Sequence, residues 1–202
     1  MGAFGTGPLD NDDALDLLSV LEDGRFDEAR EWLGDDSRPE YWVALAHLSL
    51  HPENYDGSLQ ALGHFLSPYV PELRYRMEEV LHNKEWIDSW IDDIRPVIRG
   101  LRDALPQHCP VCHRLIEDPS HGTRHHWVPK SRGGKFMMPL HRMCHQTIHS
   151  LFSNARLEKQ LATPQALRAH PKLQPYLSWI RSKPSAYYDR SRKSVMRKRE
   201  GA

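Results

Sequence analysis

Residues 125–149 decide the fold of this chain, and they read HHWVPKSRGGKFMMPLHRMCHQTIH. Two adjacent histidines open the stretch, and the pair Gly133 and Gly134 that follows favours a tight turn. His145 and His149 close the stretch. Because they lie four residues apart, they share one face of a helix and can chelate one ion. The stretch therefore combines a turn signal, a helix signal and metal ligands in one short segment.

The wider segment 106–141 is rich in Cys, His, Gly and Pro and shows no helical period. Short strands near 124–128 and 136–140, joined by the glycine turn, fit this segment best. A helix is expected to begin near Arg142 and to run to about Phe152.

Helices are expected on both sides of this unit, and the first hundred residues are predicted to be all-α. Asn11 or Asp12 can cap the first helix. The most regular apolar pattern runs over 85–104, where Trp86 and Trp90 are expected to be core residues. The other helices are expected near 25–33, 39–49, 57–66 and 71–82, after caps at Asn154 and Thr163, and after Pro171.

Charge divides the chain into two halves. Residues 1–100 carry 8 Lys and Arg against 21 Asp and Glu, which gives 8 − 21 = −13. Residues 101–202 carry 19 against 6, which gives 19 − 6 = +13, and they also hold nine of the 13 histidines. A basic, His-rich half indicates a polyanion partner, most often nucleic acid. The opposite charges also predict an intramolecular contact between the two halves.

Hydropathy and cysteine usage indicate a cytoplasmic protein without a membrane partner. No apolar run is long enough to cross a bilayer, and the N-terminus lacks the basic start and apolar core of a signal peptide. Only three cysteines are present, an odd number that argues against a disulfide scaffold. Their spacing points to metal binding instead.

The cysteines and one histidine form two short pairs, Cys109 with Cys112 and His141 with Cys144. In each pair two residues separate the ligands, so that one tight turn can aim both side chains at one ion. Two such pairs complete the tetrahedron that structural zinc prefers, and thiolates and imidazole suit zinc better than calcium or magnesium. The alternative is three reduced cysteines beside a surface histidine. His141 is the weakest member of the set, and His108 and His113 are the alternative candidates for the fourth zinc ligand.

A second ligand group is predicted from histidines alone. On an extended strand, His125 and His126 point to opposite sides, so one can join His145 and His149 at an ion while the other reaches a different target. Three imidazoles leave coordination positions open for phosphate oxygens, where a metal stabilises developing charge. An imidazole that titrates near neutral pH can act as the general base. The alternative is a scatter of surface histidines.

With these residues in view, segment 107–152 resembles the HNH endonuclease family, which has a ββα-metal fold. The string His-His-x-x-Pro-x-Ser-x-Gly-Gly followed by Cys-His-x-x-x-His carries the resemblance. A closer resemblance, to small bacterial HNH proteins with His-Arg-x-Cys-His and a segment like 163–171, extends to roughly residue 190. The resemblance implies a metal-dependent endonuclease that hydrolyses phosphodiester bonds in DNA. An all-α N-terminal domain followed by this ββα-metal unit and additional C-terminal helices makes the expected fold class α+β.

The resemblance also implies a role for each matched residue. His126 matches the general base, and His125, His145 and His149 match the ligands of one catalytic divalent cation. Manganese, cobalt or nickel is expected there, with magnesium weaker, because magnesium prefers oxygen ligands. Phe136 stands where the family has a central Asn that steadies the loop and the base. The residues that match the zinc knuckle are Cys109, Cys112, His141 and Cys144.

Basic residues around this site are candidates for gripping phosphates. The tail from Arg190 to Arg199 is a further candidate for nucleic-acid contact, with a solvated basic face as the alternative. Trp127 is expected to pack inside the strand–strand–helix unit rather than to stack on a nucleic-acid base. The candidate phosphate contacts are Arg124, Lys130, Arg132, Lys135 and Arg142.

The N-terminal half resembles a bacterial domain family of unknown function. Residues 1–7 and 10–16 resemble the opening of that family, and 85–104 resembles its last helix, which supports a domain boundary near 105. The predicted domains are an acidic all-α domain at 1–104, an HNH nuclease domain with trailing helices at 105–185, and a basic, disordered tail at 186–202.

Two other functions fit the same residues. One is a zinc-stabilised nucleic-acid-binding protein without catalytic turnover, and the other is a toxin-like nuclease restrained by its N-terminal domain. A binding protein would not need all four of the histidines at 125, 126, 145 and 149, so this set favours the nuclease.

Overall fold

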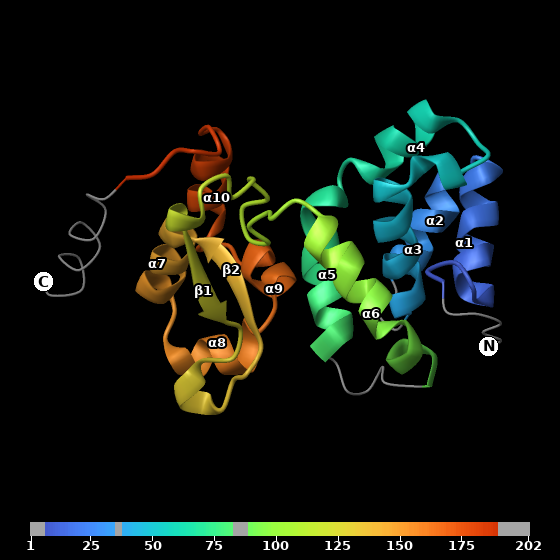
Figure 1. The fold of residues 1–202 in the computed structure, drawn as a ribbon. Helices are drawn as coiled ribbons and strands as arrows, with labels where there is room; N and C mark the ends of the chain where they lie inside the picture. The colour runs from blue at the N-terminus through green and yellow to red at the C-terminus, as the bar shows by residue number, and fades with distance from the viewer. Residues whose placement is uncertain (1–6, 35–37, 83–88, 190–202) are drawn as a thin grey trace, which may run out of the picture. The chain divides into compact units, whose positions relative to one another are not determined.

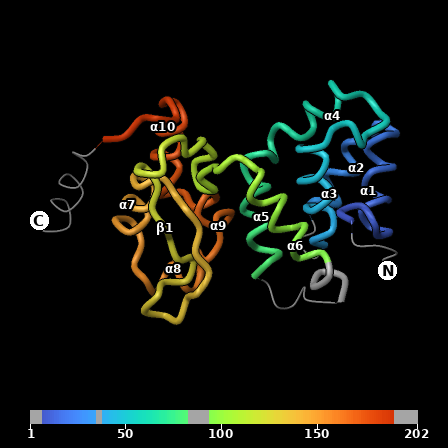
Figure 2. The backbone as a smooth tube through the Cα atoms, viewed as in Figure 1, coloured from blue at the N-terminus to red at the C-terminus, as the bar shows by residue number. Residues whose placement is uncertain are grey.

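The fold is given by a computed structural model that describes residues 7–34, 38–82 and 89–189 (Figure 1). The chain divides into two compact units, Met1–Pro106 and Gln107–Ala202, whereas the sequence placed the boundary between residues 104 and 105. The first unit is helical and the second combines helices with a two-stranded sheet, so the chain is α+β as predicted. Figure 2 traces the backbone through both units.

The first unit is built around α3 (Pro39–Leu50), which contacts α1, α5 and α6. Val43, Leu45 and Leu48 of this helix are all fully buried. Trp86 and Trp90 were predicted to be core residues. Trp86 and the side chain of Trp90 lie outside the described residues. The other helices of the unit are α1 (Asp12–Glu22), α2 (Phe26–Leu33), η1 (Pro52–Asn54), α4 (Leu59–Leu66), α5 (Val70–His82) and α6 (Ser89–Ala104).

Local signals in the sequence account for several of these helix ends. The Asn11 side chain accepts a 2.8 Å hydrogen bond from the amide of Ala14, so Asn11 rather than Asp12 caps α1.

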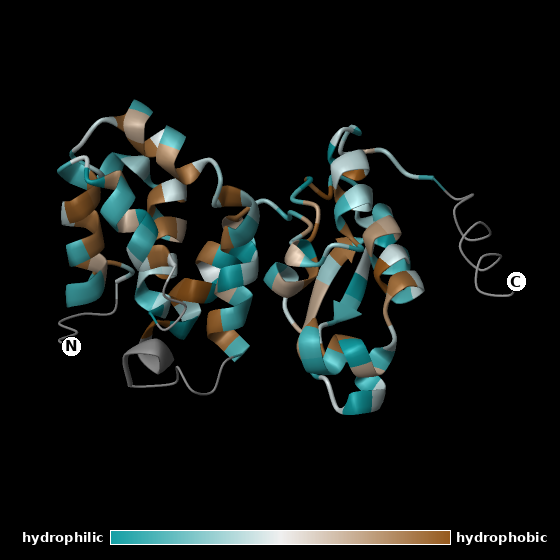
Figure 3. Ribbon diagram, turned by 180° about the vertical axis from the view of Figure 1, so that it is seen from behind, coloured by the Kyte–Doolittle hydropathy of each residue, from teal (hydrophilic) through white to brown (hydrophobic). Residues whose placement is uncertain are grey.

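Hydrophobic and hydrophilic residues alternate around the helices of both units, as Figure 3 shows. Among the described residues, none of the helices combines the length and the apolar character that a membrane span needs.

The second unit contains the predicted strand–strand–helix arrangement. Strand β1 (Gly122–His126) pairs antiparallel with β2 (Met137–His141), from Gly122 opposite His141 to His126 opposite Met137. Helix α7 (Arg142–Leu151) follows β2 directly. The strand β1 was expected at 124–128 and begins two residues earlier, because its register is set by the pairing with β2.

The connection between the strands is longer than a two-residue glycine turn. It includes the 3-10 turn η4 (Lys130–Arg132), and Gly133 ends that turn with φ of 83°, in the left-handed region that glycine adopts without strain. A side chain at Gly134 would place its Cβ in collision with the carbonyl oxygen of Val128. Gly133 is therefore required for its left-handed backbone conformation, and Gly134 is required because no side chain fits beside Val128.

Three trailing helices follow α7. The N-cap of α8 is Ser153 rather than the predicted Asn154, because Ser153 has extended backbone angles and Asn154 is already helical. Thr163 caps α9 as predicted, and its hydroxyl accepts a 3.1 Å hydrogen bond from the amide of Ala166. Ahead of β1 lies a 3-10 turn, η3 (Pro119–His121). The trailing helices are α8 (Asn154–Gln160), α9 (Pro164–Ala169) and α10 (Gln174–Arg181).

Part of the segment expected to be a disordered tail packs against this unit. The guanidinium of Arg114 donates to the carbonyl oxygen of Tyr187 at 3.4 Å. The ring of Tyr188 stacks on that of His121 with centroids 5.2 Å apart. The expectation was therefore wrong for residues 186–189, because a buried arginine and an aromatic stack hold them, and residues 190–202 lie outside the described part.

Candidate functional site

Cys109, Cys112, His141 and Cys144 come together in the second unit. Each offers one ligand atom, and these atoms all lie within 4.8 Å of one another. All four residues are buried. His141 ends β2, Cys144 lies in the first turn of α7, and the two remaining cysteines lie in the turn before η3. The group can hold a structural metal such as zinc, and it includes neither of the predicted substitutes for His141.

Neighbouring groups orient two of these ligands. The Nε2 atom of His141 lies 3.2 Å from the carbonyl oxygen of Leu115, to which it donates, and this leaves a lone pair on Nδ1. That Nδ1 atom lies 3.3 Å from the sulfur of Cys112. The hydroxyl of Tyr176 donates to the sulfur of Cys144 at 3.4 Å. Both contacts are of the kind that fixes the orientation of metal ligands.

The three thiols also have the electrostatics of a cation site. Burial opposes ionisation of Cys109, yet hydrogen bonds from Cys112, Cys144 and His141 lower its pKa well below the usual value. The hydrogen bond to Cys109 in turn raises the pKa of Cys112 and of Cys144, so the protein alone stabilises only one thiolate. A divalent cation would stabilise the remaining thiolates, and the residues present therefore fit zinc.

A second group consists of His125 on β1 and of His145 and His149 on α7. Their ligand nitrogens also lie within 4.8 Å of one another. The ring centroids of His125 and His149 are 5.3 Å apart, and those of His145 and His149 are 4.9 Å apart. The spacing of four residues on α7 thus has the effect predicted, because it turns both helix histidines toward the strand.

His125 is the most unusual member of this group. Its side chain is 1% exposed, and neither ring nitrogen has a hydrogen-bond partner among the residues that the structure describes. A buried polar atom left without a partner costs free energy, so such atoms need an explanation. Coordination of a cation supplies one. The hydroxyl of Thr123 lies 3.4 Å from Nδ1 of His145, which leaves the Nε2 atom of that ring for the cation.

The three imidazoles are held in the neutral form that binds metals. Burial, together with repulsion from His145, His149 and His126, lowers the pKa of His125 to about 3. Burial and repulsion from His149 and His126 lower the pKa of His145 to about 4, and burial alone lowers the pKa of His149. A metal ion therefore meets no competition from protons at neutral pH.

His126 is separated from these ligands, as the alternation of a strand predicts. It is the last residue of β1, it lies opposite Met137 in the pairing, and it is half-buried and outside the group of three. Trp127 is 2% exposed, and its ring meets that of His125 edge to face at 5.2 Å. The expectation that Trp127 packs rather than stacks on a base is consistent with this burial.

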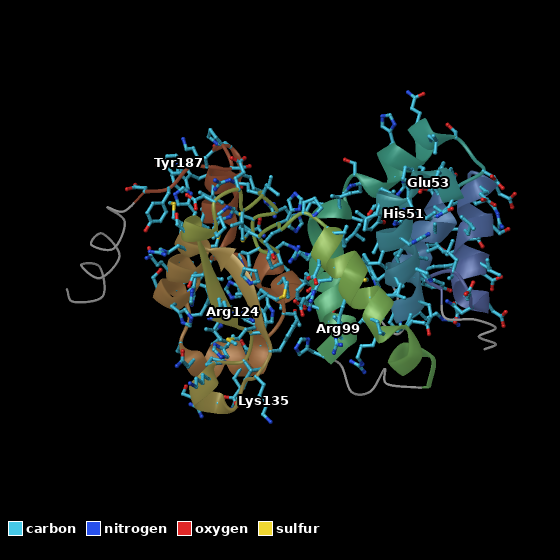
Figure 4. All side chains as sticks on the ribbon, in the orientation of Figure 1. His51, Glu53, Arg99, Arg124, Lys135 and Tyr187 are labelled. Carbon is cyan, nitrogen blue, oxygen red and sulfur yellow. The ribbon has the colours of Figure 1, made fainter. Side chains whose placement is uncertain are left out.

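The five predicted phosphate contacts differ in their surroundings. Arg132 forms an ion pair with Glu158 at 3.5 Å, and Arg142 donates to the carbonyl oxygen of Ser120 at 3.0 Å. The other three are exposed and, within the described residues, form no ion pair; two of them are labelled in Figure 4. These three are Arg124, Lys130 and Lys135.

Two contributors to the metal groups were not predicted. Thr123 lies two residues before His125, so strand alternation places both on one face and could have identified it. Tyr176 lies 32 residues after Cys144, and no local sequence pattern links them.

Comparison with known proteins gives one informative match. No protein-family model matches the sequence, and no solved structure matches it significantly. Over 80 residues, or 39% of this chain, the sequence is 36% identical to the uncharacterized protein YisB of Bacillus subtilis (strain 168). The matched region covers 80% of that protein. The chain therefore belongs to the same family as YisB of Bacillus subtilis.

Proposed function

We propose that the second unit is a metal-dependent endonuclease of the HNH type that hydrolyses phosphodiester bonds in DNA. One observation carries this proposal. A fully buried histidine, His125, has two ring nitrogens without a partner in the described part of the chain, and it faces two helix histidines with His126 beside it. A binding protein without turnover would not need all four of these histidines.

His126 is proposed as the general base. It accepts a proton from the water that attacks phosphorus, while the bond from phosphorus to the leaving oxygen breaks. His125, His145 and His149 would hold a divalent cation, and Thr123 orients His145 for that task. When bound, the cation supplies stabilisation of the charge that develops on the phosphoryl and leaving oxygens. The site of three cysteines and one histidine is assigned to a structural zinc.

The nucleic-acid partner is supported by charge. The three exposed cations without ion pairs, Arg124, Lys130 and Lys135, lie in the same unit as the histidine group. Positive side chains of this kind contact phosphates and give sequence-independent affinity.

Plasmid cleavage by the full-length protein tests the proposal. Supercoiled DNA is incubated with protein and manganese, cobalt, nickel, magnesium or no added metal, and nicked and linear products are followed by gel electrophoresis. His126→Ala should lower the rate by about a hundredfold or more, as expected for loss of a general base. Arg99→Ala, an exposed change in the first unit, is the control and should cleave normally.

Three outcomes contradict the proposal in different ways. Binding of DNA without cleavage in any metal would favour the zinc-stabilised binding protein. Cleavage of a labelled RNA but not of DNA would change the substrate. Unaltered cleavage by His126→Ala would remove His126 from the mechanism.

A further inference from the structure

The turn that follows β1 is closed on itself. The carbonyl oxygen of Pro129 accepts hydrogen bonds from the amide of Arg132 at 2.8 Å and from the amide of Gly134 at 3.3 Å. Gly134 lies so close to the carbonyl group of Val128 that no side chain fits there. Because Val128 is two residues after His126, the turn begins next to the proposed base.

Helix α8 holds this turn from outside through two side chains on one helix face. The Nδ2 atom of Asn154 donates to the hydroxyl oxygen of Ser131 at 3.3 Å. One helical turn later, the carboxylate of Glu158 lies 3.5 Å from Nε of Arg132. Leu157, between them in sequence, is fully buried and anchors α8 in the unit. Two adjacent residues of the turn are therefore each paired with a residue of α8.

This pairing separates the cations of the turn into two kinds. Arg132 already has a carboxylate partner, which reduces its attraction for a phosphate. Lys130 and Lys135 are exposed and have no ion pair within the described residues. The turn carries Lys130, and Lys135 follows it directly, so a turn held by these contacts is suited to orienting a phosphate backbone.

We propose that α8 is a brace for the turn at 129–134, so that Arg132 and Asn154 are positioning residues rather than substrate contacts. The brace fixes the end of β1, with His126, and the directions in which Lys130 and Lys135 extend. This inference rests on the proposed nuclease function, and it assigns different roles to cations that the sequence pattern treats alike.

Removing either member of the ion pair distinguishes a brace from a substrate contact. A brace predicts that Arg132→Gln and Glu158→Gln both lower kcat by about twofold to fivefold, the range expected for an exposed charge pair, and leave DNA affinity in metal-free buffer unchanged. The exchanged pair, Arg132→Glu with Glu158→Arg, should restore kcat to within about twofold of wild type. A phosphate contact predicts opposite effects, since Glu158→Gln would free the cation and tighten binding while Arg132→Gln would weaken it.

Matched controls remove the effect of net charge. Glu117→Gln and Lys159→Ala each change one exposed charge in the same unit, and affinities are compared with these variants rather than with wild type.

Asn154→Ala and Ser131→Ala should lower kcat equally, and the double variant should lose no more than either one, because both remove the same hydrogen bond. Lys130→Ala with Lys135→Ala should weaken binding, unlike the brace variants.

Amide hydrogen exchange measures the brace without any cleavage. In Glu158→Gln and Asn154→Ala, the amides of Arg132 and Gly134 should exchange about twofold to fivefold faster, while those of β2 stay unchanged. Unaltered exchange in both variants would overturn the brace even if the protein is a nuclease. Faster exchange in a protein that cleaves no nucleic acid in any metal would keep the brace and refute the proposed function.

Discussion

The rings of His125 and His145 meet edge to face, with centroids 4.9 Å apart and planes inclined at 78°. The two residues come from different elements, β1 and α7, and burial holds both in the neutral state. A strand histidine buried against a helix histidine is costly to the fold unless something binds between the rings. The group can therefore hold a cation, and its properties can be measured directly.

The first prediction concerns pH. The pKa of His125 is about 3 in the folded protein, against an ordinary value of about 6.5 in an unfolded chain. Above about pH 6.5 the imidazole is neutral in both states, so its protonation does not affect stability. As pH falls from there toward 3, the unfolded chain binds a proton that the folded protein does not, and the free energy of unfolding decreases. Urea unfolding of wild type and His125→Gln across this pH range checks this, and the stability of wild type relative to the variant should decrease as pH falls.

The second prediction concerns zinc content. Protein purified without added zinc should contain one tightly held zinc per chain, and Cys144→Ser should lose it along with the folded structure of the second unit, because a structural zinc contributes directly to folding. His108→Ala, which changes a histidine outside the ligand group, should keep its zinc. Metal analysis together with circular dichroism tests both variants, and a folded, zinc-free wild type would contradict the assignment.

The third prediction concerns Tyr176, whose hydroxyl donates to Cys144. Tyr176→Phe should keep the fold but hold zinc about tenfold to a hundredfold less tightly, as changes to groups that orient ligands generally do. Competition with a chromogenic chelator gives the affinity. Tyr187→Phe removes a hydroxyl from a half-buried tyrosine of the same unit and should leave zinc affinity unchanged.

The fourth prediction concerns the metal at the histidine group. Manganese, cobalt or nickel should support faster cleavage than magnesium at equal concentration, because three imidazoles are poor ligands for magnesium. Excess zinc should bind the same histidines tightly and inhibit. Equal rates in magnesium and manganese would count against ligation by three histidines.

The sequence predicted what depends on local spacing. Within the two ligand groups, Cys109 with Cys112 and His141 with Cys144 are three positions apart and His145 with His149 are four apart. The caps at Asn11 and Thr163 likewise depend on the next three residues. The limits of β1 were misplaced because they depend on pairing with a strand beyond the turn. The packing of 186–189 was missed because Arg114, which holds that segment, lies about seventy residues away.

Cys144 and His145 are neighbours on α7, yet each belongs to a different metal group. Successive helix residues project about 100° apart around the axis. A metal at Cys144 would therefore fix the rotational phase of α7, and with it the direction in which His145 and His149 project toward His125. Loss of that metal would release this constraint and, together with the folding of the second unit, dismantle the histidine group without removing any of its ligands. A chelator that stops cleavage would then act from either centre, and only selective reloading with zinc or manganese would distinguish the two.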